Sequence, residues 1–358
     1  MYNITLISGA VPSVHNRLNY YKRKQKVLAL SYPVFVDEEY MEDFTSKFDL
    51  DVLRSTDRKG LIAEVAAKIA NGEGPWDAIL VRMGTLPYEP FDEELFGALV
   101  PGCKVIASAS AGYNEFDVDW MTRNGIWFCN TRNAVSEATA DMTIFLILAV
   151  LKDTTKAERQ AREGKWRGTS IIPTRDPRGL VLGIIGMGAI GKHVARKAAV
   201  FGLKIKYYNR TRLSPEVEAQ YDATYCSSLE ELLSSSDIVS VNCPLDAATT
   251  RMLGRKEFAQ MKDGVFFVNT ARGAIVDEDA LIEALESGKV VRAGLDVFPV
   301  EPNINPYFVA SDRCVLQPHL GGLTDGSFKL AETECLENIK ACLATGTPVT
   351  PVNQISLD

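Results

Sequence analysis

Three side chains in the second half of this chain combine acid–base chemistry with anion binding. Arg272, Glu301 and His319 each follow a short apolar run that is typical of a strand, and the other two histidines are His15 and His193. A histidine exchanges a proton near neutral pH, a carboxylate can orient its ring, and a guanidinium binds anions in fixed geometry. In an open α/β sheet, ligands bind outside the carboxyl ends of the strands. We therefore expect the three to converge on one ligand.

A glycine turn upstream of these residues predicts what that ligand includes. Leu180–Ile185 is an apolar, β-branched run, and Ala189–Phe201 has helical spacing. Between them stand Gly186, Met187, Gly188, Ala189, Ile190 and Gly191. In such a turn the first glycine permits the bend, the second admits a pyrophosphate and the third lets the helix pack on the strand. The free N–H groups of the helix then face the phosphates, so we predict dinucleotide binding.

The elements around the turn alternate. Strands are predicted at Leu203–Tyr208, Ile238–Val241, Val265–Asn269, Val291–Val297 and Cys314–Leu316. Helices are predicted at Ser228–Leu233, Arg255–Met261 and Asp277–Glu286, the last with Asp277 as its N-cap. This alternation predicts an α/β fold with a doubly wound parallel sheet, the nucleotide-binding Rossmann type.

The first 130 residues repeat the pattern in a smaller, flavodoxin-like unit. Short strands are predicted at Val27–Leu30, Asp51–Leu53, Ala78–Val81, Val105–Ala107 and Trp127–Cys129, with a helix at Leu61–Ala70 and a further strand candidate at Ile4–Ile7. Val135–Leu151 is a long helix, apolar nearly all round, and so is expected to be buried between the units. The helical tail Ser327–Ala344 can return to the first unit. We predict a first domain of residues 1–133 and 323–358, and a nucleotide domain of residues 134–322.

The residues that end the second nucleotide-binding strand indicate the cofactor. An NAD site has an acidic residue there, about 20 residues past the glycines, which binds the ribose hydroxyls. Here Tyr208 is followed by Asn209, Arg210, Thr211 and Arg212, with no carboxylate. Guanidinium groups bind a phosphate through parallel charge-assisted hydrogen bonds. We predict NADP(H), with NAD(H) as the alternative cofactor and a merely solvated arginine pair as the alternative interpretation.

The amino-acid composition restricts the classes of protein to which this chain can belong. The chain has 358 residues, 46% hydrophobic and 24% charged, with a formal net charge of −7. An acidic balance argues against nucleic-acid binding, and the longest apolar run, Met142–Leu151, is too short to span a membrane. No secretory signal and no C-x-x-C motif are visible, and the seven cysteines are scattered. We expect a cytoplasmic protein with reduced thiols and no metal site.

Several motifs in order resemble one family, the NAD(P)-dependent D-2-hydroxyacid dehydrogenases, which include glyoxylate/hydroxypyruvate reductases and D-mandelate dehydrogenases. The resemblance runs from about Asp77 to Gly346. It is carried by Gly186–Gly191, Asn242-Cys243-Pro244-Leu245, Asn269-Thr270-Ala271-Arg272-Gly273, Gly294–Phe298 with Glu301-Pro302, and Pro318-His319. Asp176-Pro177-Arg178-Gly179, after a long connection, is similar to fungal D-mandelate-type members.

The resemblance implies roles. His319 would be the general acid that protonates the carbonyl oxygen of a 2-keto acid, Glu301 would hydrogen-bond its other ring nitrogen, and Arg272 would bind the substrate carboxylate. Two loops of the smaller unit would hold substrate as well; they comprise Arg82, Met83, Gly84, Ala111 and Gly112. Cofactor contacts would come from the glycine turn, from Asn209–Arg212, and from Cys243, Pro244, Thr270, Ala271, Arg272, Asp296, His319 and Gly321.

The family also implies a homodimer that forms through the nucleotide domains. The chain departs from the family pattern at Asn242, where His is frequent, and at Arg132, where Pro is frequent. The function that these observations favour is NADPH-dependent reduction of a 2-keto acid to a D-2-hydroxy acid. The alternatives are an NAD-linked dehydrogenase that oxidises a D-hydroxy acid such as mandelate or lactate, and a non-enzymatic corepressor that senses the nicotinamide redox state.

Overall fold

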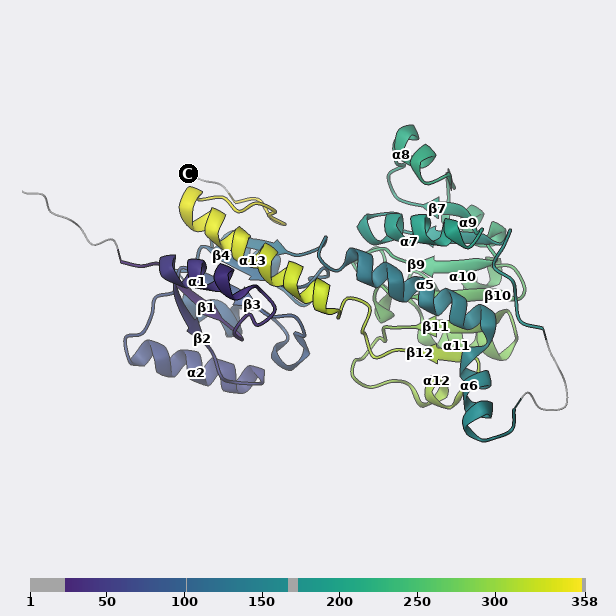
Figure 1. Ribbon diagram of the computed structural model, residues 1–358, viewed down its shortest axis with the longest axis horizontal. Coiled ribbons are helices and arrows are strands. Elements are labelled where there is room, and N and C mark those ends of the chain that lie inside the picture. The colour runs from purple at the N-terminus through teal and green to yellow at the C-terminus, as the bar shows by residue number, and fades with distance from the viewer. Residues whose placement is uncertain (1–22, 101, 167–172, 356–358) are drawn as a thin grey trace, which may run out of the picture.

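Two parallel β-sheets organise the chain, each covered by helices (Figure 1). The computed structural model describes residues 23–100, 102–166 and 173–355. One sheet has five strands in the order β2-β1-β3-β4-β5, and the other has seven in the order β12-β11-β10-β9-β6-β7-β8. Both are parallel throughout, which confirms the predicted α/β class with two doubly wound sheets. The strand candidate Ile4–Ile7 and His15 lie outside the described residues.

The five-stranded sheet is built from the first part of the chain. Its strands are β1 (Lys26–Ala29), β2 (Asp49–Val52), β3 (Ala78–Val81), β4 (Val105–Ser108) and β5 (Trp127–Asn130). Between them lie α1 (Glu38–Lys47), α2 (Arg58–Ala70), α3 (Glu93–Phe96), α4 (Val118–Arg123) and the 3₁₀ turns η1 (Leu86–Tyr88) and η2 (Gly97–Leu99). The inner strands β3 and β4 are buried along their whole length, as strands covered on both faces must be.

The seven-stranded sheet follows. Its strands are β6 (Val181–Ile185), β7 (Lys204–Tyr208), β8 (Ala223–Tyr225), β9 (Ile238–Val241), β10 (Val265–Asn269), β11 (Val290–Leu295) and β12 (Cys314–Leu316). Its helices are α6 (Thr154–Arg162), α7 (Ala189–Val200), α8 (Pro215–Gln220), α9 (Leu229–Ser235), α10 (Arg255–Gln260), α11 (Glu278–Glu286) and α12 (Pro306–Ala310), with the 3₁₀ turn η3 (Gly273–Ile275). The predicted strands were right to within a residue or two. The edge strand β8 and the helix α8 escaped prediction because both are short and largely exposed.

Two long helices connect the units. Helix α5 (Ser136–Lys152) packs against β10, β11, β12 and α7 of the seven-stranded unit, and its buried residues include Ala140, Leu146 and Val150. The sequence predicted its burial correctly, but the helix packs on the seven-stranded unit and not between the two units. Helix α13 (Asp325–Thr345), yellow in Figure 1, leaves the seven-stranded unit and lies against β3, β4 and β5. The chain therefore does return to its first unit.

The seven cysteines are free thiols in the described part of the chain, and six of them are buried. Burial raises the pKa of Cys129 to about 12 and that of Cys243 to about 11, so both remain neutral. No group of three metal-ligating side chains occurs among the described residues. No helix in that part of the chain is long and apolar enough to cross a membrane.

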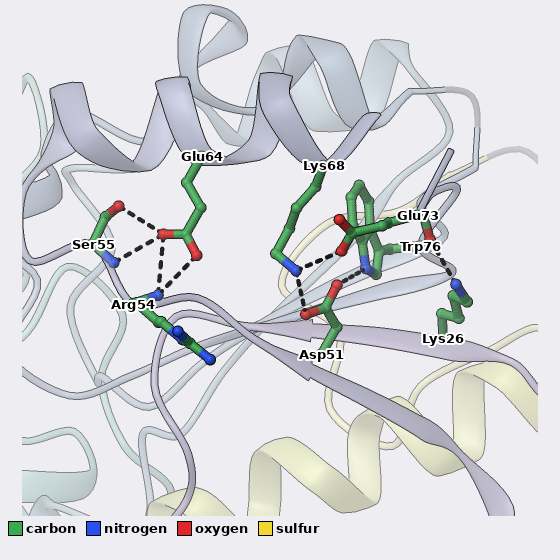
Figure 2. Close-up of polar contacts among 8 residues, drawn as sticks. All are labelled: Lys26, Asp51, Arg54, Ser55, Glu64, Lys68, Glu73 and Trp76. Atoms are coloured by element: carbon green, nitrogen blue, oxygen red, sulfur yellow. Dashed lines mark hydrogen bonds and ion pairs between the residues drawn. The ribbon is translucent and has the colours of Figure 1, made fainter. Parts of the chain in front are cut away.

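A polar cluster fastens α2 to the outer edge of the five-stranded sheet (Figure 2). The Asp51 carboxylate of β2 accepts hydrogen bonds from Nε1 of Trp76 at 3.0 Å and from Nζ of Lys68 at 2.9 Å. Lys68 also donates to Glu73 at 2.8 Å. Because Trp76 is buried, its indole N–H needs an acceptor inside the fold, and Asp51 supplies one.

We expect Asp51→Ala to lower the free energy of unfolding by about 1–3 kcal/mol, the cost of a buried donor left without a partner. Urea denaturation measures the change. Glu73→Ala is the control: it removes only the more exposed partner of Lys68 and should cost less than about 1 kcal/mol. Equal effects of the two variants would show that the indole hydrogen bond contributes nothing special.

Candidate active site

Arg272, Glu301 and His319 lie beyond the carboxyl ends of three neighbouring strands. Arg272 follows β10, Glu301 follows β11 and His319 follows β12, and these strands are parallel neighbours in the sheet. Parallel pairing places their carboxyl ends along one edge of the sheet. The strand order thus brings together the three residues that the sequence singled out.

His319 and Glu301 form the central contact of this edge. Nδ1 of His319 and Oε2 of Glu301 are 2.7 Å apart, and the other carboxylate oxygen accepts the N–H of Phe298 at 3.0 Å. Burial pushes the pKa of Glu301 upward, but the hydrogen bond and charge of His319 outweigh it, so the pKa is lowered and Glu301 is ionised at neutral pH. The histidine side chain is 41% exposed against 17% for the glutamate. Within the described chain, Nε2 of His319 has no hydrogen-bond partner, so it can contact a substrate.

The backbone of His319 is held in an unusual conformation by Asp296. His319 has a φ of 56°, in the left-handed region that β-carbons disfavour. Its N–H donates to the Asp296 carbonyl at 2.7 Å, and the next two amides, of Leu320 and Gly321, donate to the Asp296 carboxylate at 2.8 and 2.9 Å. Burial raises the pKa of Asp296, and those two amide donors oppose the rise. The tight turn aims the histidine ring at Glu301.

Arg272 spans the two units. Asn269 holds its loop, accepting the Ala271 N–H and donating to the Arg272 carbonyl, both at 3.0 Å. Nε of Arg272 donates to Oδ1 of Asn114 in the five-stranded unit at 3.0 Å. Sequence reasoning missed Asn114, although its position just after the Ala111–Gly112 loop was a usable signal.

Gly112 lies directly against the arginine. A β-carbon there would be 1.6 Å from Nη2 of Arg272, so a side chain would displace the guanidinium. The Gly112 carbonyl accepts from Ser110 and the Ala111 carbonyl from Asn130, while the N–H groups of Ala111 and Gly112 donate to no acceptor within the described chain. Two free amides beside a guanidinium can hold a carboxylate.

The second predicted loop, Arg82–Gly84, follows β3 beside the β4 loop. Arg82 is exposed, and its Nε donates a hydrogen bond to the carbonyl of buried Met83. A β-carbon at Gly84 would have no atom beyond its chain neighbours within 4 Å. Within the described chain, no hydrogen bond or ion pair joins Arg82 to Arg272, Glu301 or His319.

The glycine turn has the shape that a pyrophosphate requires. A β-carbon at Gly186 would meet the Cys243 backbone at 2.6 Å, and one at Gly191 would meet the Gly186 carbonyl at 2.4 Å. Gly188, by contrast, has open space above its α-carbon. Helix α7 starts at Ala189, and in the described chain the N–H groups of Ala189 and Ile190 donate to no acceptor outside the helix. These features fit a dinucleotide phosphate at the turn.

The remaining predicted cofactor residues line the same edge of the sheet. Asn209 accepts the Met187 N–H at 2.7 Å and so braces the glycine turn, and Thr211 is exposed. Pro244 and Thr270 have internal partners, Thr249 and Thr143 respectively. The buried Nδ2 of Asn242 has no hydrogen-bond partner in the described chain, so it has a donor to offer a ligand beside Cys243.

Arg210 and Arg212 have carboxylate partners that the sequence did not predict. Arg210 pairs with Asp246 at 3.2 Å, and Arg212 pairs with Glu218 at 2.8 Å. Both arginine side chains are still more than half exposed. At the other departure from the family pattern, Arg132 is exposed and its carbonyl accepts from Ser136.

Comparison with known proteins identifies the class. Residues 144–321 match the family model described as D-isomer specific 2-hydroxyacid dehydrogenase, NAD binding domain. A dehydrogenase of Hormonema carpetanum, efuE, is 57% identical over 93% of this chain and 83% of its own length.

Two solved structures are similar over nearly the whole chain. A glyoxylate reductase from Paecilomyes thermophila is 39% identical with a TM-score of 0.84, and covers 92% of this chain and 98% of its own. The holo form of Rhodotorula graminis D-mandelate dehydrogenase is 34% identical with a TM-score of 0.86, and covers 93% and 99%. This chain belongs to the D-isomer-specific 2-hydroxyacid dehydrogenase family and is an NAD(P)-dependent oxidoreductase.

We expect Gly188→Ala to weaken NADPH and NADH binding at least about tenfold, or ~1.4 kcal/mol, because its methyl would enter the open space at the turn. Stability should stay near that of the native chain. Gly191→Ala, in contrast, meets the Gly186 carbonyl and should lower the free energy of unfolding by about 1–3 kcal/mol. Titration of cofactor fluorescence and thermal melting measure both. Normal cofactor affinity of Gly188→Ala would contradict the assigned path of the pyrophosphate.

Proposed function

We propose that this chain reduces a 2-keto acid to a D-2-hydroxy acid with NADPH. The observation that carries the proposal is the His319–Glu301 pair, 2.7 Å apart, at the strand edge that also presents Arg272. An acid–base group and an anion-binding group beside a dinucleotide turn match what the reduction of a charged keto acid needs. The substrate domain of residues 1–133 and 323–358, the nucleotide domain of residues 134–322, a cytoplasmic location and a homodimer belong to the same proposal; light scattering tests the dimer.

The chemistry divides between cofactor and protein. When bound, the reduced nicotinamide supplies the hydride that adds to the carbonyl carbon. His319 donates the balancing proton from Nε2 to the carbonyl oxygen, since its Nδ1 is engaged by Glu301. The ionised Glu301 stabilises the protonated ring before transfer and holds its orientation. In the reverse direction the same nitrogen takes the proton from the alcohol.

Arg272 and the Ala111–Gly112 loop hold the substrate carboxylate. Nε of Arg272 is fixed on Asn114, and Nη2 lies at Gly112, so the guanidinium is positioned between the two units. Free amides at Ala111 and Gly112 supply further donors. Binding across the units would draw them together and exclude water from the reaction.

Exposed apolar side chains adjoin the site residues along the chain. Tyr113 follows Gly112, Val300 precedes Glu301, and Leu320 and Leu323 follow His319; all four are exposed. An apolar substrate side chain that contacts them would remove their surfaces from water, which supports a keto acid with an apolar side chain as the substrate.

The test of the proposal is kcat/KM for glyoxylate, hydroxypyruvate, a 2-keto sugar acid and phenylglyoxylate, each with NADPH and with NADH. Turnover with NADPH supports the reductase. Turnover only with NADH would favour the NAD-linked oxidative enzyme. Cofactor binding without turnover on any of them would favour an untested keto acid as the substrate or the redox-sensing corepressor.

We expect His319→Ala to lower kcat by about 10²–10⁴-fold, the usual contribution of a positioned general acid. Cofactor affinity should remain near normal, because the ring contacts Glu301 and not the glycine turn. Stopped-flow kinetics of keto acid reduction measures kcat, and fluorescence titration measures the cofactor affinity. An unchanged kcat would remove His319 from the mechanism.

The two arginines after β7 should favour NADPH. In the double variant Arg210→Ala/Arg212→Ala, KM for NADPH should rise at least about tenfold, since each charge-assisted hydrogen bond contributes about 1.5–3 kcal/mol. KM for NADH should change little, because NADH has no 2′-phosphate. Steady-state kinetics with both cofactors tests this. Equal losses would mean that the loop does not recognise the phosphate.

A further inference from the structure

The Glu218 carboxylate of α8 is the centre of a closed hydrogen-bond network beside β7. It accepts Nε and Nη2 of Arg212, each at 2.8 Å, and Oη of Tyr207 at 2.6 Å. The Leu213 N–H in turn donates to the Tyr207 hydroxyl at 3.0 Å. The Tyr225 ring lies under the guanidinium, with its centroid 5.3 Å away. Arg212 is thus held along one edge and on one face.

This network keeps a full negative charge next to Arg212. The Glu218 side chain is 12% exposed, and the hydrogen bonds from Arg212 and Tyr207 lower its pKa to about 2. It therefore stays ionised at any pH at which the protein would be assayed. The bidentate contact uses Nε and one Nη2 hydrogen, which leaves the Nη1 edge of the guanidinium for another anion.

The neighbouring arginine also has a carboxylate partner. Arg210 pairs with Asp246, so two guanidinium groups at this edge face two carboxylates. A 2′-phosphate carries about −1.5 to −2 charge at pH 7. It would meet arginines whose positive charge is already offset, and not the free cations that the sequence suggested.

We infer that Glu218 sets how strongly this chain discriminates NADPH from NADH. The inference rests on the proposed cofactor site. Glu218 fixes the position of Arg212 while its charge repels the 2′-phosphate from behind the guanidinium. The ribose hydroxyl of NADH is neutral and feels no such repulsion. Glu218 thus narrows the preference for NADPH and keeps NADH usable.

The experiment compares two probes that need no catalysis, adenosine 2′,5′-bisphosphate and AMP, by titration calorimetry on the full chain. Glu218→Gln removes the charge but retains the shape and an acceptor for Tyr207. We expect it to bind the bisphosphate about three- to fivefold more tightly relative to AMP, an effect that shrinks as salt rises because screening weakens it. Glu216→Gln, an exposed position on the same helix, is the matched control and should leave the ratio unchanged.

An equal or lower bisphosphate-to-AMP affinity ratio in Glu218→Gln overturns the inference, and so does an equal gain in Glu216→Gln. Because the ratio is taken within each variant, a general loss of binding cancels. The proposed function is tested separately. If the native chain bound both probes equally, its proposed preference for NADPH would be contradicted. The comparison of the native chain with Glu218→Gln would still decide the role of Glu218.

Discussion

The site depends on the hydrogen bonds that the buried Asp296 carboxylate accepts from the backbone after His319. Asp296 directly follows β11 and accepts the N–H groups of Leu320 and Gly321 in the loop beyond β12, so it ties together the segments that leave two neighbouring strands. A buried carboxylate is costly unless it is hydrogen-bonded, and its two amide partners are available only if His319 takes its left-handed conformation. That constraint turns the imidazole toward Glu301. Asp296 thereby positions the His319 ring that is proposed to act as the general acid.

Close backbone approach is the second constraint. Gly112 admits the Arg272 guanidinium, and a β-carbon at Gly273 would fall 2.0 Å from the Phe298 carbonyl carbon. Gly273 therefore lets the loop that carries Arg272 press against the loop that leads to Glu301. Side chains at either place would move the charged groups apart. Glycines thus set the distances between Arg272, its partner loop and the loop that leads to Glu301.

In the loop after β7, carboxylates from other elements offset the charge of two arginines. Two arginines after a nucleotide-binding strand suggest strong phosphate binding when they are considered alone. In the folded chain each is paired with a carboxylate that comes from a different element, Glu218 from α8 and Asp246 from the loop after β9. Counting basic residues along a loop therefore overstates the positive charge that a ligand meets.

Residue types and spacing were enough to predict the two parallel sheets, the glycine turn and the shared edge of Arg272, Glu301 and His319. These follow from local patterns: strand periodicity, turn chemistry and the rule that parallel strands end at one edge. The sequence also predicted the N-cap at Asp277, which accepts the Ala280 N–H as expected. Such features depend on residues that are near one another in the chain.

The partners of side chains that lie on separate elements became known only from the folded chain. The contact from Asn114 to Arg272, the pairing of Glu218 with Arg212 and the left-handed turn at His319 depend on where whole elements pack. Helix α8 is too short and too exposed for its periodicity to predict that Glu218 lies beside Arg212. The kind of chemistry at the site could thus be predicted from residue types. The net charge around the arginines and the orientation of the His319 ring depend on long-range packing, because no local pattern encodes which distant groups meet.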